Sequence, residues 1–267
     1  MPFIELKGGR LNYRTDGPDS GPAILLSNLL GTSMGVWDSQ VAPLARHFRV
    51  VRYDTRGHGL SDIFAGPLKI EALGRDALAL LDELGIERAH FCGLSLGGLT
   101  GLWLGINAAD RIDRLALCNM AARVGTVEGW NTRIGMVRQG GMEAIVSATL
   151  QRWFTPGFIA GAPTVIEAMR QMLLQTPSKG YVACCEALRD ANLAAEASRV
   201  TARTLVVSGT HDPVTPPEAG HFLAEKIQGA RYVELPASHI SNVEAAEPFT
   251  AALLDFLNEA PKSREAR

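Results

Sequence analysis

"HFCGLSLGGLTGLWLGINA", residues 90–108, is the stretch that decides the fold of this chain. Residues 90–93 form an apolar run typical of a buried strand, and the small apolar residues after Gly97 predict a helix. Between them stands Gly93-Leu94-Ser95-Leu96-Gly97, which puts a serine at a sharp strand-to-helix turn. Such a turn exposes the Ser95 hydroxyl at the carboxyl edge of a sheet, beside unpaired N–H groups of the helix. Alone, the pattern also fits a glycine-rich turn with an incidental serine, so the flanking chain must decide.

Strands and helices alternate before and after this turn. An alternating apolar pattern around Gly8-Gly9 predicts an antiparallel hairpin near the start of the chain. Continuous apolar runs and helical spacing predict the following elements: strands at 23–27, 48–54 and 115–118, a helical stretch around 37–44, and an amphipathic helix at 70–84. This alternation predicts an α/β fold with a mostly parallel sheet and helices on both faces.

Residues 121–197 interrupt the alternation. They contain no convincing strand, and their spacing predicts four helices: 128–138, 142–153, 164–175 and 181–187. The strand pattern then resumes in ARTLVVSGTHDPVTPP and ARYVELPASHI, and a last helix is expected from Pro248 to Asn258. We therefore expect one core domain formed by residues 1–120 and 198–267, with residues 121–197 inserted as a helical cap subdomain.

Composition excludes several classes of function. A formal charge of -2 and a pI near 6.3, with no basic run except the short PKSREAR at the end, argue against a nucleic-acid partner. The first residues lack the apolar core of a signal peptide, and no apolar run is long enough to span a membrane. The four cysteines (Cys92, Cys118, Cys184 and Cys185) show no C-x-x-C spacing. We expect a cytoplasmic protein that acts on small molecules, with its oligomeric state left open.

Ser95 needs a base, because a serine hydroxyl keeps its proton at neutral pH. In hydrolases that use this turn the chain order is serine, then acid, then histidine, which restricts the base to His211, His221 or His239. We predict His239, in the polar loop PASHIS just beyond the expected strand 232–235. His221 lies within a helical pattern, and His211 is adjacent to the expected acid.

Asp212 is the expected acid. It follows the apolar strand in VVSGTHDPVTPP, where its carboxylate can accept a hydrogen bond from His239. Asp before Pro also initiates turns, but the strand position and the chain order favour the catalytic role. The rival position after strand 115–118 holds Asn119, which carries no charge. His58, in RYDTRGHGLSD, precedes the serine turn, and we expect it to hold a loop through hydrogen bonds.

An oxyanion intermediate needs two N–H donors. The Leu96 N–H comes with the serine turn, and we expect the second from Leu29, in the loop after strand 23–27. The neighbouring Asn28 brings a side-chain amide to the same loop and is a further candidate for contact with the substrate.

Four segments together resemble known enzymes. LLSNLLGTSMGVWDSQV, RYDTRGHGLSD and FCGLSLGG resemble the α/β hydrolases, and with GWNTRIGMVRQGGMEAIVSATLQRWFTP they resemble more narrowly the 3-oxoadipate enol-lactonases of the β-ketoadipate pathway. The serine turn and RGHGxSD occur across the superfamily and say little about substrate. More weight rests on Ser27-Asn28, where many relatives have His-Gly, and on the last segment. The resemblance implies the α/β-hydrolase fold with an inserted helical cap.

The resemblance also implies a substrate and a reaction. The substrate is a five-membered enol-lactone with a carboxymethyl group, hydrolysed to 3-oxoadipate in aromatic-compound catabolism through a Ser95 acyl-enzyme. A small anionic substrate needs a cation in an apolar pocket, and the cap segment offers Arg133 and Arg138. We favour Arg133, since it shares a helix face with Trp130, although the pattern also fits a solvated surface arginine. Trp153 is a candidate for the pocket wall, as is Phe154, and both also fit the core of the cap. No cofactor or metal ion is expected.

Two alternative functions remain open on the sequence. One is a carboxylesterase, or a C–C bond hydrolase of another ring-cleavage product, with an almost identical site. The other is a hydrolase-fold receptor that binds a small ligand and turns over slowly. Dehalogenase and epoxide hydrolase chemistry is disfavoured, because those relatives have aspartate in place of Ser95.

Overall fold

One eight-stranded sheet forms the centre of the computed structural model, which describes residues 2–259. Within that range the strand order is β1-β2-β4-β3-β5-β6-β7-β8. The strands are β1 Phe3–Leu6, β2 Gly9–Asp16, β3 Ala23–Ser27, β4 Arg49–Tyr53, β5 Ala89–Leu94, β6 Ile112–Cys118, β7 Arg203–Gly209 and β8 Arg231–Leu235. All pairs from β4 to β8 are parallel, and β1 and β2 form the antiparallel hairpin expected around Gly8-Gly9. The predicted α/β-hydrolase fold class is confirmed.

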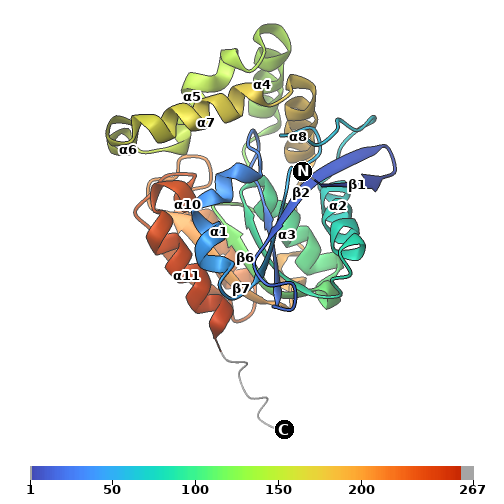
Figure 1. Cartoon of the computed structure of the whole chain (residues 1–267). Helices are drawn as coiled ribbons and strands as arrows, with labels where there is room; N and C mark the ends of the chain where they lie inside the picture. The colour runs from blue at the N-terminus through green and yellow to red at the C-terminus, as the bar shows by residue number, and fades with distance from the viewer. Residues whose placement is uncertain (1, 260–267) are drawn as a thin grey trace.

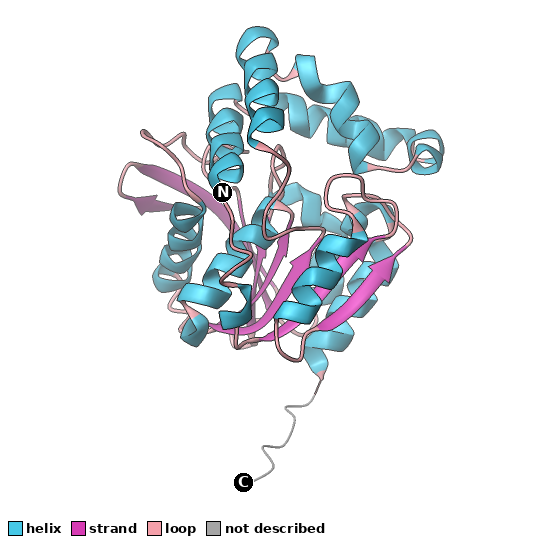
Figure 2. Ribbon diagram, turned by 180° about the vertical axis from the view of Figure 1, so that it is seen from behind, coloured by secondary structure: helices cyan, strands magenta, loops and turns pink. Residues whose placement is uncertain are grey.

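Helices cover both faces of the sheet (Figures 1 and 2). Helix α1 (Asp38–Leu44), which follows the 3₁₀ turn Met34–Trp37, packs beside α11 (Ala246–Asn258). Helix α2 (Ile70–Glu83) packs beside α3 (Leu96–Asn107), and α9 (Pro217–Lys226) packs on β7 and β8. Strands β3 and β5 are buried along their whole length, as their continuous apolar runs predict.

Five helices, all within the described part of the chain, lie between β6 and β7 in the sequence. They gather at one end of the sheet as a separate layer (Figure 1). The helices are α4 Val127–Gly140, α5 Glu143–Trp153, α6 Pro156–Gly161, α7 Pro163–Gln175 and α8 Ser178–Asp190. Four of them match the expected helices, whereas α6 was not expected. It begins at Pro156, has only six residues and is too short to show a helical period.

Several boundaries differ from the sequence prediction, among them both ends of α8, which spans Ser178–Asp190 instead of the expected 181–187. Helix α11 begins at Ala246, so Pro248 lies inside its first turn, and a short helix α10 (Ser241–Glu244) precedes it. Strand β6 begins at Ile112, because its polar residues before Leu115 still pair with β5 and β7. The basic PKSREAR stretch lies outside the described residues. No helix among residues 2–259 is long and apolar enough to cross a membrane.

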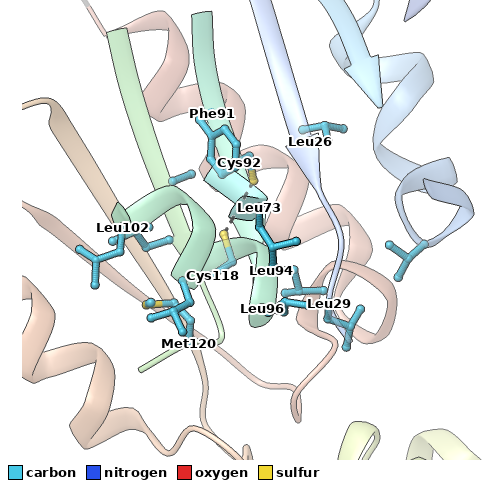
Figure 3. Packing of buried hydrophobic residues seen from close by; sticks show 14 of the residues in the cluster. Leu26, Leu29, Leu73, Phe91, Cys92, Leu94, Leu96, Leu102, Cys118 and Met120 are labelled. Carbon is cyan, nitrogen blue, oxygen red and sulfur yellow. Dashed lines mark hydrogen bonds between the residues drawn. The ribbon is translucent and has the colours of Figure 1, made fainter. Parts of the chain in front are cut away.

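Helix α3 lies unusually close to the sheet. A Cβ atom on Gly101 would stand 2.7 Å from Cε1 of Phe91 in β5, so only glycine fits at this contact. Figure 3 shows the apolar side chains around this contact, including Leu102 of α3 and Met120 just beyond β6. It also shows Cys92 and Cys118 pointing toward each other, with their Sγ atoms 3.8 Å apart. The close contact fixes α3, and with it Ser95, against the strand ends.

Candidate active site

Ser95 stands at the strained turn between β5 and α3. Its φ of 54° and ψ of -108° place it in a backbone region that non-glycine residues rarely adopt. Its N–H donates to the Cys118 carbonyl at 2.9 Å, which ties the turn to β6. A Cβ on Gly93 would approach the Gly97 carbonyl oxygen to 2.1 Å, and one on Gly97 would approach the Ser27 carbonyl oxygen to 2.2 Å. Both glycines are therefore required by close backbone contacts.

The structure brings the three predicted catalytic side chains into one hydrogen-bonded chain. Ser95 Oγ lies 2.9 Å from His239 Nε2, and His239 Nδ1 lies 2.8 Å from Asp212 Oδ2. His239 follows β8 in a loop and Asp212 follows β7, so three strand ends meet at one edge of the sheet. All three residues are buried. The other two candidate histidines lie elsewhere, with His221 half-exposed on α9 against the Tyr232 ring.

Asp212 is held as a carboxylate by its surroundings. Burial alone raises its pKa, but the charge and hydrogen bond of His239 and the bonds from Thr215 outweigh burial and leave the pKa below its ordinary value. Thr215 donates twice, from its N–H at 3.0 Å and its hydroxyl at 2.8 Å, and the Val214 N–H donates at 2.8 Å. An ionised Asp212 suits a partner that stabilises a protonated imidazole.

Asn119 is a further member of this site that the sequence suggested only as a rival acid position. It directly follows β6 with a φ of 45°, and its amide Nδ2 donates to Asp212 Oδ2 at 3.2 Å and to the Ser238 carbonyl at 3.1 Å. Its Oδ1 accepts a bond from the Ser241 hydroxyl at 2.5 Å. Asn119 thus connects the acid to the loop that bears His239.

The loop after β3 lies beside Ser95. Among the described residues, none accepts a hydrogen bond from the backbone N–H of Leu29 or Leu96, so both donors are free for a ligand. His58 holds this loop as expected, since its Nε2 accepts the Gly31 N–H at 3.0 Å. Asn28 is placed differently from the prediction of substrate contact, because its amide donates to the Tyr53 carbonyl at 2.8 Å and it does not line the cavity.

A cavity of about 650 Å³ opens above Ser95 and His239, between the sheet edge and the layer of helices. Trp130, Arg133 and Trp153 all line it, as the sequence predicted for a substrate pocket. Arg152 also lines it and was not predicted. An arginine in the last turn of a helix is the ordinary pattern for a solvated cation at the negative end of the helix dipole, so sequence gave no reason to single it out.

Two other residues considered for the pocket lie outside it. Arg138 is exposed and pairs with Glu186 at 2.8 Å. Phe154 is buried and stacks on Phe158, with ring centroids 5.2 Å apart. Within residues 2–259 no group of three or more His, Cys, Asp or Glu side chains is arranged to hold a metal ion.

Comparison with known proteins bears out the resemblance drawn from the motifs. The crystal structure of the enol-lactonase from Burkholderia xenovorans LB400 matches with a TM-score of 0.95 at 50% identity, covering 97% of this chain and 100% of that one. The 3-oxoadipate enol-lactonase 2 of Acinetobacter baylyi is 43% identical over 243 residues, 91% of each chain. A putative carbamate hydrolase RutD of Caulobacter sp. is 31% identical, covering 89% of this chain and 93% of its own.

The family model described as the alpha/beta hydrolase fold matches residues 22–246. That range runs from just before β3 to the start of α11, and it contains Ser95, Asp212 and His239 together with the whole layer of helices. Strand order, the strained serine turn and sequence similarity all agree, and the chain belongs to the α/β-hydrolase fold family.

Proposed function

We propose that this protein hydrolyses 3-oxoadipate enol-lactone to 3-oxoadipate through a Ser95 acyl-enzyme. One observation carries the proposal. Ser95, His239 and Asp212 form a hydrogen-bonded chain at the floor of a cavity whose lining includes arginine side chains. The similarity to proteins named as enol-lactonases supports the choice of substrate. By analogy with these enol-lactonases, we propose that the protein acts in the catabolism of aromatic compounds.

In the first half of the reaction Ser95 Oγ attacks the lactone carbonyl carbon and gives its proton to His239 Nε2. The carbonyl becomes an oxyanion, which the free N–H groups of Leu29 and Leu96 stabilise. When the intermediate collapses, the bond between the carbonyl carbon and the ring oxygen breaks. His239 returns the proton to that oxygen, and the enol so released becomes a ketone.

In the second half water cleaves the acyl-enzyme. His239 accepts a proton from water as its oxygen attacks the ester carbon, and the same two N–H groups hold the second oxyanion. The bond to Ser95 Oγ then breaks, and the serine recovers its proton from His239. The product carries two carboxylates, one new and one from the carboxymethyl group.

The cavity suits a small anion. Trp130 and Trp153 supply apolar wall, and the guanidinium of Arg133 supplies a positive charge within it. We propose that residues 121–197 act as a cap subdomain on a core of residues 1–120 and 198–267, with the cap providing this specificity. We also propose a cytoplasmic location, which four free cysteines support because a reducing compartment keeps thiols unpaired.

The test is a spectrophotometric assay with freshly generated enol-lactone beside a neutral aryl ester. We expect a strong preference for the lactone, and a loss on the order of 10⁶-fold in kcat for Ser95→Ala, because the nucleophile is removed. Circular dichroism of the variant controls for folding. Retained turnover in Ser95→Ala would overturn the serine mechanism, whereas preference for the aryl ester, or for a carbamate, would overturn only the substrate.

A further inference from the structure

The cavity above Ser95 has an unbalanced charge. Two arginines, Arg133 and Arg152, line it, and among its described lining residues no Asp or Glu is present. A partly buried space with positive charges and no carboxylate attracts anions and disfavours cations. The two arginines differ in what their side chains already bind.

The Arg133 side chain already donates hydrogen bonds to two neutral hydroxyl groups. Its Nε donates to the Tyr181 hydroxyl at 2.6 Å, and its Nη2 donates to the Thr149 hydroxyl at 2.7 Å. Its guanidinium carbon also lies 5.6 Å from the centroid of the Tyr181 ring. Tyr181 is buried, and burial raises its pKa, so the phenol stays neutral. Arg133 therefore has few donors left, and its orientation is fixed.

Arg152 has no such partner. Within residues 2–259 its side chain makes no hydrogen bond and no ion pair, although it lines the same cavity. Partial burial, and then the charge of Arg133, lower its pKa, so the two guanidinium groups are close enough for each to act on the other. Arg152 is solvent-exposed at the wall of the cavity. Its guanidinium has all five donors free and lies near a second cation, so it is available to receive an anion that enters the cavity.

The backbone of Arg152 is fixed relative to the reacting groups. Its carbonyl accepts the Ser238 hydroxyl at 3.0 Å, and the next carbonyl, of Trp153, accepts the Ile240 N–H at 3.1 Å. Ser238 and Ile240 flank His239 on either side. The distance from the base of the Arg152 side chain to the catalytic histidine is therefore set by two hydrogen bonds.

We propose that Arg152 binds the substrate carboxylate directly, in a bidentate pair, while Arg133 acts as a fixed charge that strengthens the pair. The ligand class is a small ester or lactone with a carboxylate on its acyl chain. Because hydrolysis creates a second carboxylate, short dicarboxylates are the matching inhibitors. This inference rests on the proposed function for its natural substrate, but its test uses other esters.

The test compares 4-nitrophenyl hemisuccinate, which carries a carboxylate, with neutral 4-nitrophenyl butyrate of similar length. For Arg152→Met we expect KM for the hemisuccinate to rise by about 10- to 100-fold, with kcat changed little and both constants for the butyrate unchanged. Arg152→Lys should recover part of the loss, and the inhibition constant for adipate should rise in parallel. Arg138→Met is the matched control, since Arg138 lies in the last turn of α4 but outside the cavity.

The outcomes separate the two proposals. If Arg152→Met behaves like Arg138→Met, or if both esters lose equally, Arg152 is a solvated helix-end residue and the inference is wrong. If Arg133→Met alone raises KM for the hemisuccinate, the roles of the two arginines are reversed, and the inference is wrong again. Failure of the wild-type protein to open the enol-lactone would overturn the proposed substrate, while the ester pair would still report on Arg152.

Discussion

Backbone strain is concentrated on two residues at neighbouring strand ends. Among residues 2–259, Ser95 and Asn119 are the only non-glycine residues with positive φ, and they directly follow the adjacent strands β5 and β6. Such conformations cost on the order of 1–3 kcal/mol each and persist where surrounding contacts enforce them. Here the Ser95 N–H is bonded to the Cys118 carbonyl, and the Asn119 N–H is bonded to the Val207 carbonyl. The strain accompanies the orientation of one side chain toward His239 and of the other toward Asp212.

Residue types differed in how well sequence predicted their roles. Ser95, Asp212 and His239 were found because turn chemistry and chain order are local signals, and the structure brings them together. Asn119 was not, because its contacts with Asp212 and Ser238 join residues far apart in the sequence. Arg152 was not, because an arginine in the last turn of a helix is ordinarily a solvated cation. Asn28 was misplaced for the same reason as Asn119, since its amide is turned toward the carbonyl of Tyr53.

His58 predicts a pH dependence of stability. Burial lowers its pKa from 6.5 to about 4, and its neutral Nε2 accepts the Gly31 N–H. Between these two values the unfolded chain binds a proton that the folded chain does not, so stability falls as the pH falls from about 6.5 to about 4. The loss over that window amounts to about 3 kcal/mol.

Denaturant unfolding at a series of pH values measures this effect. His58→Gln removes the titration, so the stability difference between wild type and variant should shrink as the pH falls through the window. His221→Gln, at an exposed histidine, is the control and should leave the profile unchanged. Parallel profiles for wild type and His58→Gln would show that His58 does not titrate in this way.

At the scale of elements, the segment joining α5 to α6 is fastened to the loop that carries His239. Glu244 of α10 accepts the Ser238 N–H at 2.8 Å and the Thr155 N–H at 3.1 Å, and it also accepts the Thr155 hydroxyl. One carboxylate thus bonds both the layer of helices and the catalytic loop. Together with the bonds from Ser238 and Ile240, it makes this edge of the cavity a fixed boundary.

Replacing Glu244 tests the importance of this connection. We expect Glu244→Ala to lower the free energy of unfolding by about 1–3 kcal/mol, because two partly buried N–H donors lose their acceptor. We also expect kcat to fall, because His239 loses the contact that fixes its loop. Denaturant unfolding and steady-state kinetics measure the two effects, and the exposed Glu247→Ala is the control. Equal behaviour of the two variants would contradict the proposed connection.

Helices and strands were predicted well where the segment was long enough to show a pattern of apolar residues. Strands β3 and β5 and helix α2 show continuous or amphipathic patterns, and their bounds agree within a residue or two. Helix α6 has six residues and α10 has four, so neither completes enough turns to show a pattern. The start of β6 was missed because its early polar residues lie near the rim of the sheet, where alternation replaces a continuous apolar run.

At the scale of the whole molecule, the site is a junction between two layers. The sheet supplies Ser95, Asp212 and His239 from three strand ends, while α4 and α5 supply the arginines. The chain order of strands predicts which ends meet, so the grouping of these three side chains was accessible from sequence. The arrangement of α4–α8 depends on packing between helices, so the sequence predicted part of the cavity lining (Trp130, Arg133 and Trp153) but not Arg152.

The cysteines give a prediction for the intact molecule. All four are free and buried, and burial raises the pKa of Cys185 to about 12 and also raises that of Cys118. We expect none to react with Ellman's reagent in the native protein and all four to react after unfolding in guanidinium chloride. Dithiothreitol should leave the unfolding midpoint unchanged. Fast labelling of the native protein would show that the chain opens more readily than its packing implies.

The close contact of α3 with the sheet has a consequence for laboratory evolution. Because Gly97 and Gly101 touch neighbouring atoms directly, random libraries built on α3 will return mostly inactive clones. Trp130 and Arg133 of α4 and Arg152 and Trp153 of α5 line the cavity without supporting the serine turn. New substrate ranges are therefore reached by diversifying α4 and α5 while α3 is left as it is.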